Sequence, residues 1–266
     1  MNHPSRRAVL CWGQILFLAP TVSAGRQSAQ ETRSDPGGPH ADFPRQPPAL
    51  AREMVGVAHG NVARVKELVS ATPALARASW EWGYGDWETA LGAASHVGNK
   101  EIASILLAAG AHPTIFSAAM LGHLDVVKSF IAVSPGIQRT RGPHGINLLD
   151  HARAGQSTEV IKYLESVGDA DARYPNEPLP EGDVDGLLGE YRFGAGATDA
   201  LTVSRNNRGI LVVKREGEPE RNLFHHGGRL FNPSGAEGVR IRFEPATGRA
   251  TTLTVVDGPL RVEARR

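Results

Sequence analysis

Cysteine is nearly missing from this sequence of 266 residues, which contains only Cys11. A single cysteine excludes an intramolecular disulfide and any zinc site built from several cysteines. An excess of charge is missing as well, because 29 Lys and Arg oppose 28 Asp and Glu. The resulting net charge of +1 argues against a strongly basic nucleic-acid-binding protein, although it leaves a local basic patch open.

Known catalytic motifs are also missing. The chain has no nucleophile elbow, phosphate-binding loop, zinc-protease helix or dinucleotide fingerprint. Glycine-rich pieces such as 194–196 lie between expected strands, so they are interpreted as turns. We therefore expect a protein that is not an enzyme and that needs no cofactor. Acidic residues distant in the sequence could still converge, which leaves an unrecognised hydrolase as an alternative.

The chain does contain enough apolar residues for a core, since hydrophobic residues make up 41% of it. Glycine and proline are abundant, because 30 Gly and 18 Pro together make 48 residues. These 48 of 266 residues are 18% of the chain, against an average share of about 12% for glycine and proline, which indicates many turns or a loose segment. The length predicts one or two domains.

Residues 1–24 are typical of an export signal. Arg6 and Arg7 precede the apolar stretch 8–19, and 22–24 supplies small residues for a signal peptidase. The segment 5–10 also resembles a bacterial twin-arginine signal, although Val9 stands where Phe is usual. Ordinary secretion, twin-arginine export and a retained anchor all stay open. We expect a periplasmic or secreted bacterial protein with no membrane span after cleavage.

Cleavage would remove Cys11 and two arginines, so the mature net charge becomes 27 − 28 = −1. A chain without cysteine suits an oxidising compartment without disulfides. Two segments rich in proline, 25–48 and 171–183, are predicted to be linkers, the first of them disordered.

Helical repeats are predicted for 49–170. Four segments share a Gly, a polar residue and an apolar stripe at helical spacing, beginning at Gly60, Gly98, Gly122 and Gly155. Alanine-rich helical segments precede the last three of these glycines. We expect each Gly to permit a left-handed turn between two closely packed helices.

These segments resemble ankyrin repeats. The stretch WETALGAA at 87–94 is similar to the family's Thr-Pro-Leu-His-x-Ala motif, and LLAAGAHP at 106–113 is similar to its helix-ending segment. The spacings between the glycines are 38, 24 and 33 residues, against a family period of about 33. The resemblance therefore implies a solenoid of about four repeats with a long first finger, a shortened third unit and a third finger of roughly normal length.

The long finger contains every tryptophan of the mature chain within 80–87. Gly83 and Gly85 favour a turn flanked by aromatic side chains. Exposed aromatic residues on a loop are typical interface anchors, so one hypothesis is a partner-binding surface. Its residues are Trp80, Trp82, Tyr84 and Trp87. The alternative hypothesis is that these side chains pack beneath the finger or against the C-terminal domain.

Histidines occur in or beside the turns between helices, at His59, His96 and His123. Stacked repeats separate equivalent positions by about 10 Å. That spacing is too long for one ion with bonds near about 2 Å, so the sequence predicts capping or surface roles and no metal site. The pair His225 and His226 is likewise interpreted as part of a turn.

An all-β domain is predicted for 184–266, where short alternating segments are separated by turns. The expected strands cover 187–193, 200–205, 209–214, 221–225, 229–232, 239–244, 250–255 and 260–263. This pattern is typical of an antiparallel meander or barrel. In 239–244, Val239, Ile241 and Phe243 are expected to face one side.

This domain resembles the small lipocalin-like domain appended to bacterial serine-β-lactamase-like hydrolases. The likeness depends on LGEY at 188–191, LTV at 201–203, RLF at 229–231, RF at 242–243 and LTV at 253–255. In those proteins the domain accompanies a catalytic domain, which this sequence does not contain. The resemblance therefore implies fold and export context rather than activity.

These observations lead to one expectation and one alternative. We expect an exported, monomeric, non-catalytic scaffold that binds an unknown protein of the cell envelope through its concave face and the tryptophan finger. The alternative is a small-molecule-binding module, because an eight-stranded barrel can enclose a ligand.

Overall fold

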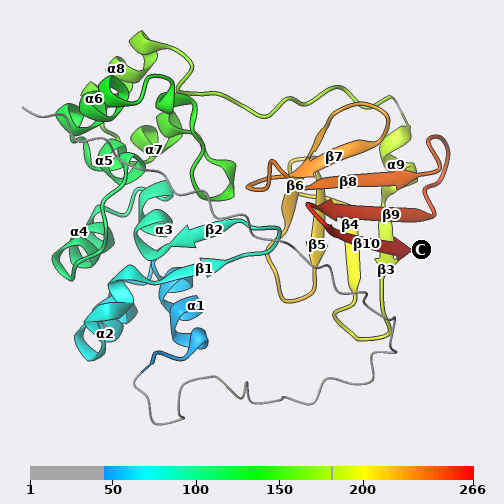
Figure 1. The fold of residues 1–266 in the computed structure, drawn as a ribbon, viewed down its shortest axis with the longest axis horizontal. Helices are drawn as coiled ribbons and strands as arrows, with labels where there is room; N and C mark the ends of the chain where they lie inside the picture. Colours follow the sequence, from blue (N-terminus) through cyan, green and yellow to red (C-terminus); the bar gives the residue numbers. More distant parts are fainter. Residues whose placement is uncertain (1–44, 181) are drawn as a thin grey trace, which may run out of the picture. The chain divides into compact units, whose positions relative to one another are not determined.

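The computed structural model describes residues 45–180 and 182–266 (Figure 1). The expected export signal and all but the last residues of the 25–48 linker lie outside the described residues. Helices come first in the chain, and a β-barrel follows in its C-terminal half. The mixed fold class expected from the sequence is confirmed at this level. None of the described helices has the length and apolar character that a membrane crossing needs.

Eight helices of seven to ten residues fill the first half of the described chain. They are α1 (Pro48–Val57), α2 (Val62–Ala71), α3 (Ala90–His96), α4 (Lys100–Ala108), α5 (Ile115–Leu121), α6 (Leu124–Val133), α7 (Leu148–Ala154) and α8 (Thr158–Val167). Asn61 and Asn99 cap α2 and α4, since their side-chain oxygens accept the backbone N–H of Arg64 and Ile102 at 3.0 Å. The polar residue after Gly60 and the one after Gly98 therefore cap the start of a helix.

Connecting segments differ in structure from one helix pair to the next. The short helix η1 (Pro73–Arg77) and a hairpin of β1 (Ser79–Glu81) and β2 (Trp87–Thr89) separate α2 from α3. The connection from α4 to α5 has no strand. Before α7, η2 (Ile137–Arg139) and η3 (Pro143–Gly145) accompany a single bridge between Arg141 and Asn147. The expected long finger is therefore a hairpin.

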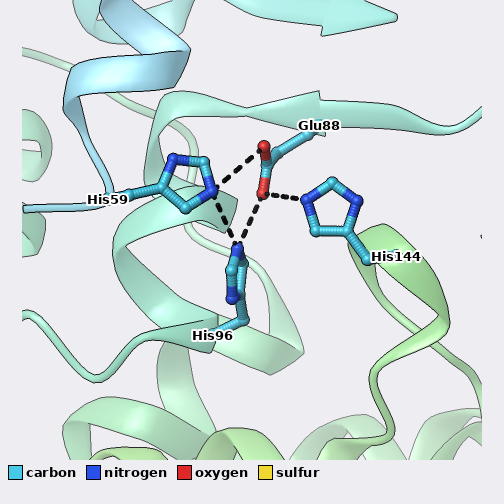
Figure 2. A group of neighbouring side chains, drawn as sticks. All are labelled: His59, Glu88, His96 and His144. Carbon is cyan, nitrogen blue, oxygen red and sulfur yellow. Dashed lines mark hydrogen bonds and ion pairs between the residues drawn. The ribbon is translucent and has the colours of Figure 1, made fainter. Parts of the chain in front are cut away.

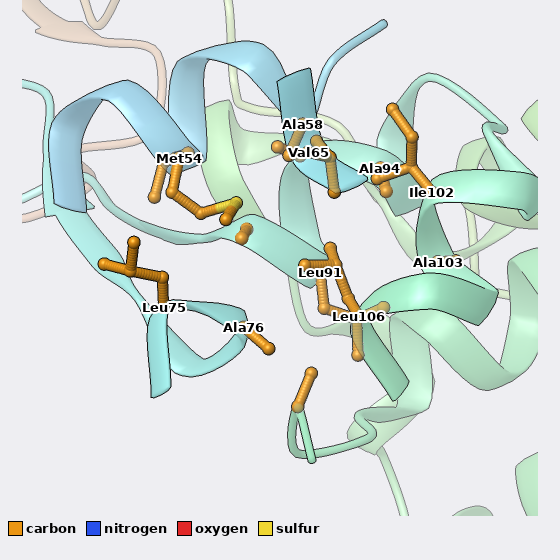
Figure 3. Packing of buried hydrophobic residues seen from close by; sticks show 14 of the residues in the cluster. Met54, Ala58, Val65, Leu75, Ala76, Leu91, Ala94, Ile102, Ala103 and Leu106 are labelled. Atoms are coloured by element: carbon orange, nitrogen blue, oxygen red, sulfur yellow. The ribbon is translucent and has the colours of Figure 1, made fainter. Parts of the chain in front are cut away.

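Two apolar clusters hold the helices together. The first includes Met54, Val65, Leu91, Ile102 and Leu106, all of them at most 1% exposed (Figure 3). The second is formed by α5 to α8. Many of the buried side chains are alanines, which lets neighbouring helices approach closely.

Two glycines are required for different reasons. Gly98 has φ of +75°, and a Cβ there would also lie 2.1 Å from the carbonyl oxygen of Ala154. Gly155 has an ordinary φ of −79°, yet a Cβ added at this position would lie 1.9 Å from the carbonyl oxygen of Met120. The expected left-handed turn is confirmed at Gly98 and Gly122, but it is wrong at Gly60 and Gly155, neither of which has a positive φ. At Gly155, glycine is needed because backbones of neighbouring helix pairs touch.

The second half of the chain is a closed antiparallel barrel. Its strands are β3 (Gly189–Arg192), β4 (Ala200–Arg205), β5 (Leu211–Arg215), β6 (Arg221–His225), β7 (Leu230–Pro233), β8 (Arg240–Glu244), β9 (Thr252–Asp257) and β10 (Leu260–Arg265). Consecutive strands pair, and β10 closes the barrel against β3. All eight expected strands are confirmed, with ends that differ by a few residues.

Side chains fill the interior of the barrel. Val239, Ile241 and Phe243 are at most 1% exposed, as the alternation predicts, and Phe243 packs edge-on against Tyr191 and Phe231. An eight-stranded barrel has an interior just wide enough for such filling. The short helix α9 (Asp183–Leu187) provides Asp183, which pairs with the buried Arg229.

We predict that Gly155→Ala destabilises the fold by about 2 kcal/mol or more, because the added methyl group overlaps the Met120 carbonyl. Gly60→Ala is the matched control, since nothing lies within 4 Å of its Cβ position. The control should leave the free energy of unfolding within about 1 kcal/mol of the parent. Urea unfolding measures both, and equal effects of the two substitutions would contradict the close approach.

Candidate metal centre

The hairpin of β1 and β2 distributes its aromatic side chains over different surroundings. Trp80 and Trp82 are partly buried against the first helical cluster, and Tyr84 is packed against the barrel core. Trp87 differs, with 65% of its surface exposed. The structure therefore places three of the four expected partner-binding residues in packing positions and leaves only Trp87 on the surface.

Four side chains from separate segments converge beside this hairpin (Figure 2). His59 follows α1, Glu88 lies in the middle of β2, His96 ends α3 and His144 lies in η3. One ligand atom from each lies within 4.8 Å of the others. Such a set of imidazole and carboxylate donors is typical of zinc sites.

The distances between the donor atoms are short. Nε2 of His96 lies 3.1 Å from Nε2 of His59 and 3.0 Å from Oε1 of Glu88. Nε2 of His144 lies 3.3 Å from the same Oε1, and Nε2 of His59 lies 3.6 Å from Oε2. Tetrahedral bonds of about 2.0–2.1 Å require ligand atoms about 3.3–3.4 Å apart. These four separations, 3.0 to 3.6 Å, lie near that spacing, and one ligand atom from each of the four residues lies within 4.8 Å of the others.

The sequence argument against a shared site is wrong for His59 and His96. It assumed that side chains keep the separation of their helices, whereas both imidazoles reach across the stack and their ring centroids are 4.9 Å apart. His123 is exposed and is not part of the cluster. The third imidazole comes instead from His144, whose φ of +60° is the left-handed conformation.

The hydrogen bonds of the Nδ1 atoms of His59 and His144 determine which ring nitrogens face Glu88. Nδ1 of His59 lies 3.0 Å from the carbonyl oxygen of Gly56, and Nδ1 of His144 lies 2.7 Å from Oδ2 of Asp86. A carbonyl oxygen only accepts hydrogen bonds, so Nδ1 of His59 carries a proton. Nδ1 of His144 also lies 3.0 Å from Nη1 of Arg221, and its proton is assigned to the shorter contact with Asp86. In the neutral imidazoles, the Nε2 lone pairs then point toward Glu88. This support from behind is usual for histidines that bind metals.

Glu88 is the buried anion at the centre of the cluster, with 0% exposure. Its Oε2 accepts a hydrogen bond of 2.7 Å from the indole Nε1 of Trp82. Its Oε1 is buried and has no hydrogen-bond partner among the described residues, although two Nε2 atoms lie nearby. Lone pairs that face one another repel, so a proton or a metal cation must lie among them.

The pKa values of Glu88 and His144 also show that the cluster favours a positive charge. Burial by itself raises the pKa of Glu88, but the contacts with His144 and His96 outweigh burial and lower it to about 2. Burial also lowers the pKa of His144, whereas Asp86 and Glu88 raise it to about 9. Without a metal ion, the site therefore keeps a proton on His144 at neutral pH.

Asp86 connects this cluster to the barrel. Asp86 is 3% exposed. Its carboxylate accepts a hydrogen bond of 3.0 Å from the backbone N–H of His144 and forms an ion pair with the buried Arg221 of β6. Arg221 also donates to the carbonyl oxygen of Trp82 at 3.0 Å. Burial raises the pKa of Asp86, but His144 and Arg221 lower it further than burial raises it. Residues 46–266 form one compact unit, and this ion pair lies within it.

Glu88 and His144 are the members of the cluster that sequence reasoning missed. Glu88 alternates with the exposed Trp87 and Thr89, so the strand pattern could have predicted its burial. His144 lies in the loop RGPHGI at 141–146, where no spacing relates it to the other histidines.

Comparison with known proteins adds little to this geometry. No family model matches the chain, and no curated protein matches it. Among solved structures, a crystal structure of SurE with D-Leu is 25% identical with a TM-score of 0.24, and it covers 43% of this chain and 28% of that chain. A crystal structure of SurE is 24% identical with a TM-score of 0.25 and covers 44% and 28%. At these TM-scores the likeness carries no argument about fold or activity.

We predict that Arg221→Met lowers the free energy of unfolding by about 3 kcal/mol, because it leaves a buried carboxylate with one partner fewer. Asp86→Asn combined with Arg221→Met should recover part of that loss, since no unpaired charge remains. Arg208→Met, at an exposed turn, is the control. Urea unfolding measures all three, and a loss below about 1 kcal/mol for Arg221→Met would contradict the ion pair's importance.

Proposed function

We propose that this protein binds a divalent transition-metal ion, with Zn²⁺ as the ion that suits its donors best. His59, Glu88, His96 and His144 are the proposed ligands. The observation that carries the proposal is the buried Oε1 of Glu88, which has no hydrogen-bond partner among the residues that the structure describes and lies 3.0 and 3.3 Å from two Nε2 atoms. Three imidazole nitrogens and one carboxylate oxygen are donors that zinc commonly takes in tetrahedral sites.

The proposed role of the ion is structural. A four-ligand protein set leaves no coordination position free for substrate, which is typical of structural rather than catalytic zinc. The ligands come from segments that are up to 85 residues apart, from His59 to His144. An ion shared by them would bind the folded chain and not the unfolded one, so its binding free energy stabilises the fold.

We predict that the metal-free protein takes up one Zn²⁺ per chain and becomes more stable. A free ion concentration 100 times the Kd adds about 2.7 kcal/mol to the free energy of unfolding. That gain corresponds to a rise in Tm of about 5 °C or more for a chain of this size. Calorimetric titration and thermal unfolding measure the two effects, and visible absorption of bound Co²⁺ reports the geometry.

Single-histidine variants test the assignment of ligands. His59→Ala and His144→Ala should weaken Zn²⁺ binding by more than the roughly 10- to 100-fold typical of losing a residue that supports a ligand. His123→Ala is the matched control, because this histidine is exposed and outside the cluster. The proposal fails if the parent protein binds no Zn²⁺, in which case a protonated His144 balances Glu88. It also fails if all three variants bind the ion equally well.

For the fold that carries this site, we propose that the helices form ankyrin-type repeats and that the barrel is a lipocalin-like domain. Four helix pairs, the hairpin before α3 and the short connection before α5 support the first assignment. Eight antiparallel strands in sequential order support the second. The sequence pattern expected of an export signal at 1–24 supports a periplasmic or secreted location.

A second candidate function is non-catalytic binding of a protein partner in the cell envelope. The observation in its favour is Trp87, a large apolar side chain that is 65% exposed on the hairpin. Affinity capture of the mature protein from envelope extract, followed by mass spectrometry, would identify a partner. The Trp87→Ala variant should lose that partner while keeping its bound Zn²⁺. Equal capture by both proteins would contradict a role for Trp87.

A further inference from the structure

A pocket of about 330 Å³ lies between the hairpin and the barrel. Its apolar wall includes Trp82, Tyr84, Phe193, Leu201, Val255 and Val262. Ligand sites in proteins usually have volumes of about 300–1,000 Å³ and combine such a wall with a few polar groups. This pocket adjoins the barrel core, since its lining residue Leu201 belongs to that core, and Trp82, which donates to Glu88, also lines the pocket.

The polar groups of the pocket differ in whether they have partners. Glu81 accepts the backbone N–H of Gly85 at 2.7 Å, and Arg215 donates to the carbonyl oxygen of Thr198 at 3.0 Å. Oε2 of Glu218 is buried and has no hydrogen-bond partner among the described residues. That oxygen is itself closed to solvent, so a ligand in the pocket would meet the Glu218 carboxylate as a group, and a carboxylate with an unpartnered oxygen gains most from a charged donor.

The segment that carries Glu218 is held in place. It lies in the turn between β5 and β6, where its backbone N–H donates to the carbonyl oxygen of Arg215 at 3.1 Å. Arg52 of α1 donates to the carbonyl oxygen of Gly217 at 2.9 Å. The carboxylate is therefore presented by a turn that both the barrel and the helices anchor.

Tyr84 lines the same pocket in an unusual backbone conformation. Its φ is +62°, between Gly83 at +96° and Gly85 at +76°. A non-glycine residue in this region is disfavoured by about 1–3 kcal/mol and is often found at functional sites. Burial raises the pKa of its hydroxyl to about 12, so the ring is neutral. The unfavourable conformation directs an uncharged aromatic ring against the barrel core.

We propose that this pocket binds a small organic amine with an apolar body. The ammonium group would pair with the carboxylate of Glu218, and the apolar body would lie against Tyr84 and Leu201. The two acidic side chains in the lining outnumber the single Arg215, which favours a cation over an anion. This site is independent of the proposed metal centre, so each can fail without the other.

The experiment compares three probes of similar size on the full chain by calorimetric titration. They are 2-phenylethylammonium, 3-phenylpropionate and 2-phenylethanol. We expect the ammonium probe to bind with a Kd at least about tenfold lower than those of the other two, since a charged hydrogen bond forms at Glu218. Glu218→Gln should remove this preference, and the neighbouring exposed Glu216→Gln should keep it.

A blocking variant tests the position of the ligand. Val262→Trp places a larger ring in the pocket from an exposed strand position and should abolish binding of the ammonium probe, whereas Val262→Ala should retain it. Far-ultraviolet circular dichroism and the urea unfolding transition of each variant confirm that it is folded. The proposal is overturned if the parent shows no saturable binding of the ammonium probe, if the carboxylate binds as tightly, or if Glu218→Gln keeps the preference.

Discussion

The burial of two carboxylates on one short hairpin is the constraint that the surrounding structure satisfies. Glu88 is 0% exposed and Asp86 is 3% exposed, and a buried anion is stable only with charged or hydrogen-bonding partners around it. The partners of Glu88 are imidazoles on the helical segments and the indole of Trp82. Those of Asp86 are His144 and the barrel residue Arg221. One hairpin therefore requires cationic groups from both halves of the chain.

His144 is the residue shared by the two carboxylates. Its Nδ1 faces Asp86 and its Nε2 faces Glu88, at 2.7 and 3.3 Å. A metal ion bound at Nε2 would leave the proton on Nδ1, so the contact with Asp86 would be kept in the loaded protein. Metal binding at Nε2 of His144 is therefore compatible with the Asp86–Arg221 ion pair, because the same imidazole contacts Asp86 through its other nitrogen.

Close packing of the helix pairs is what brings the histidines together. The contacts of Gly98 with Ala154 and of Gly155 with Met120 show that different helix pairs approach until their backbones touch. At that separation, side chains on adjacent turns are long enough to meet, as His59 and His96 do at 3.1 Å. Alanine at many buried helix positions permits the same approach along the helices. Small residues in the stack thus create the conditions for a cluster of large polar ones.

Local patterns in the sequence determined the helices, the eight strands and the turn at Gly83 and Gly85, because periodicity and turn chemistry act over a few neighbouring residues. The candidate site was not predictable in this way. His59, Glu88, His96 and His144 share no motif, and the separation of helix axes gave the wrong distance between side chains. The exposure of Trp87 and the burial of its neighbours likewise depend on which surfaces meet. Tertiary packing decided both, since the long-range contacts that place a side chain leave no local trace in the residues beside it.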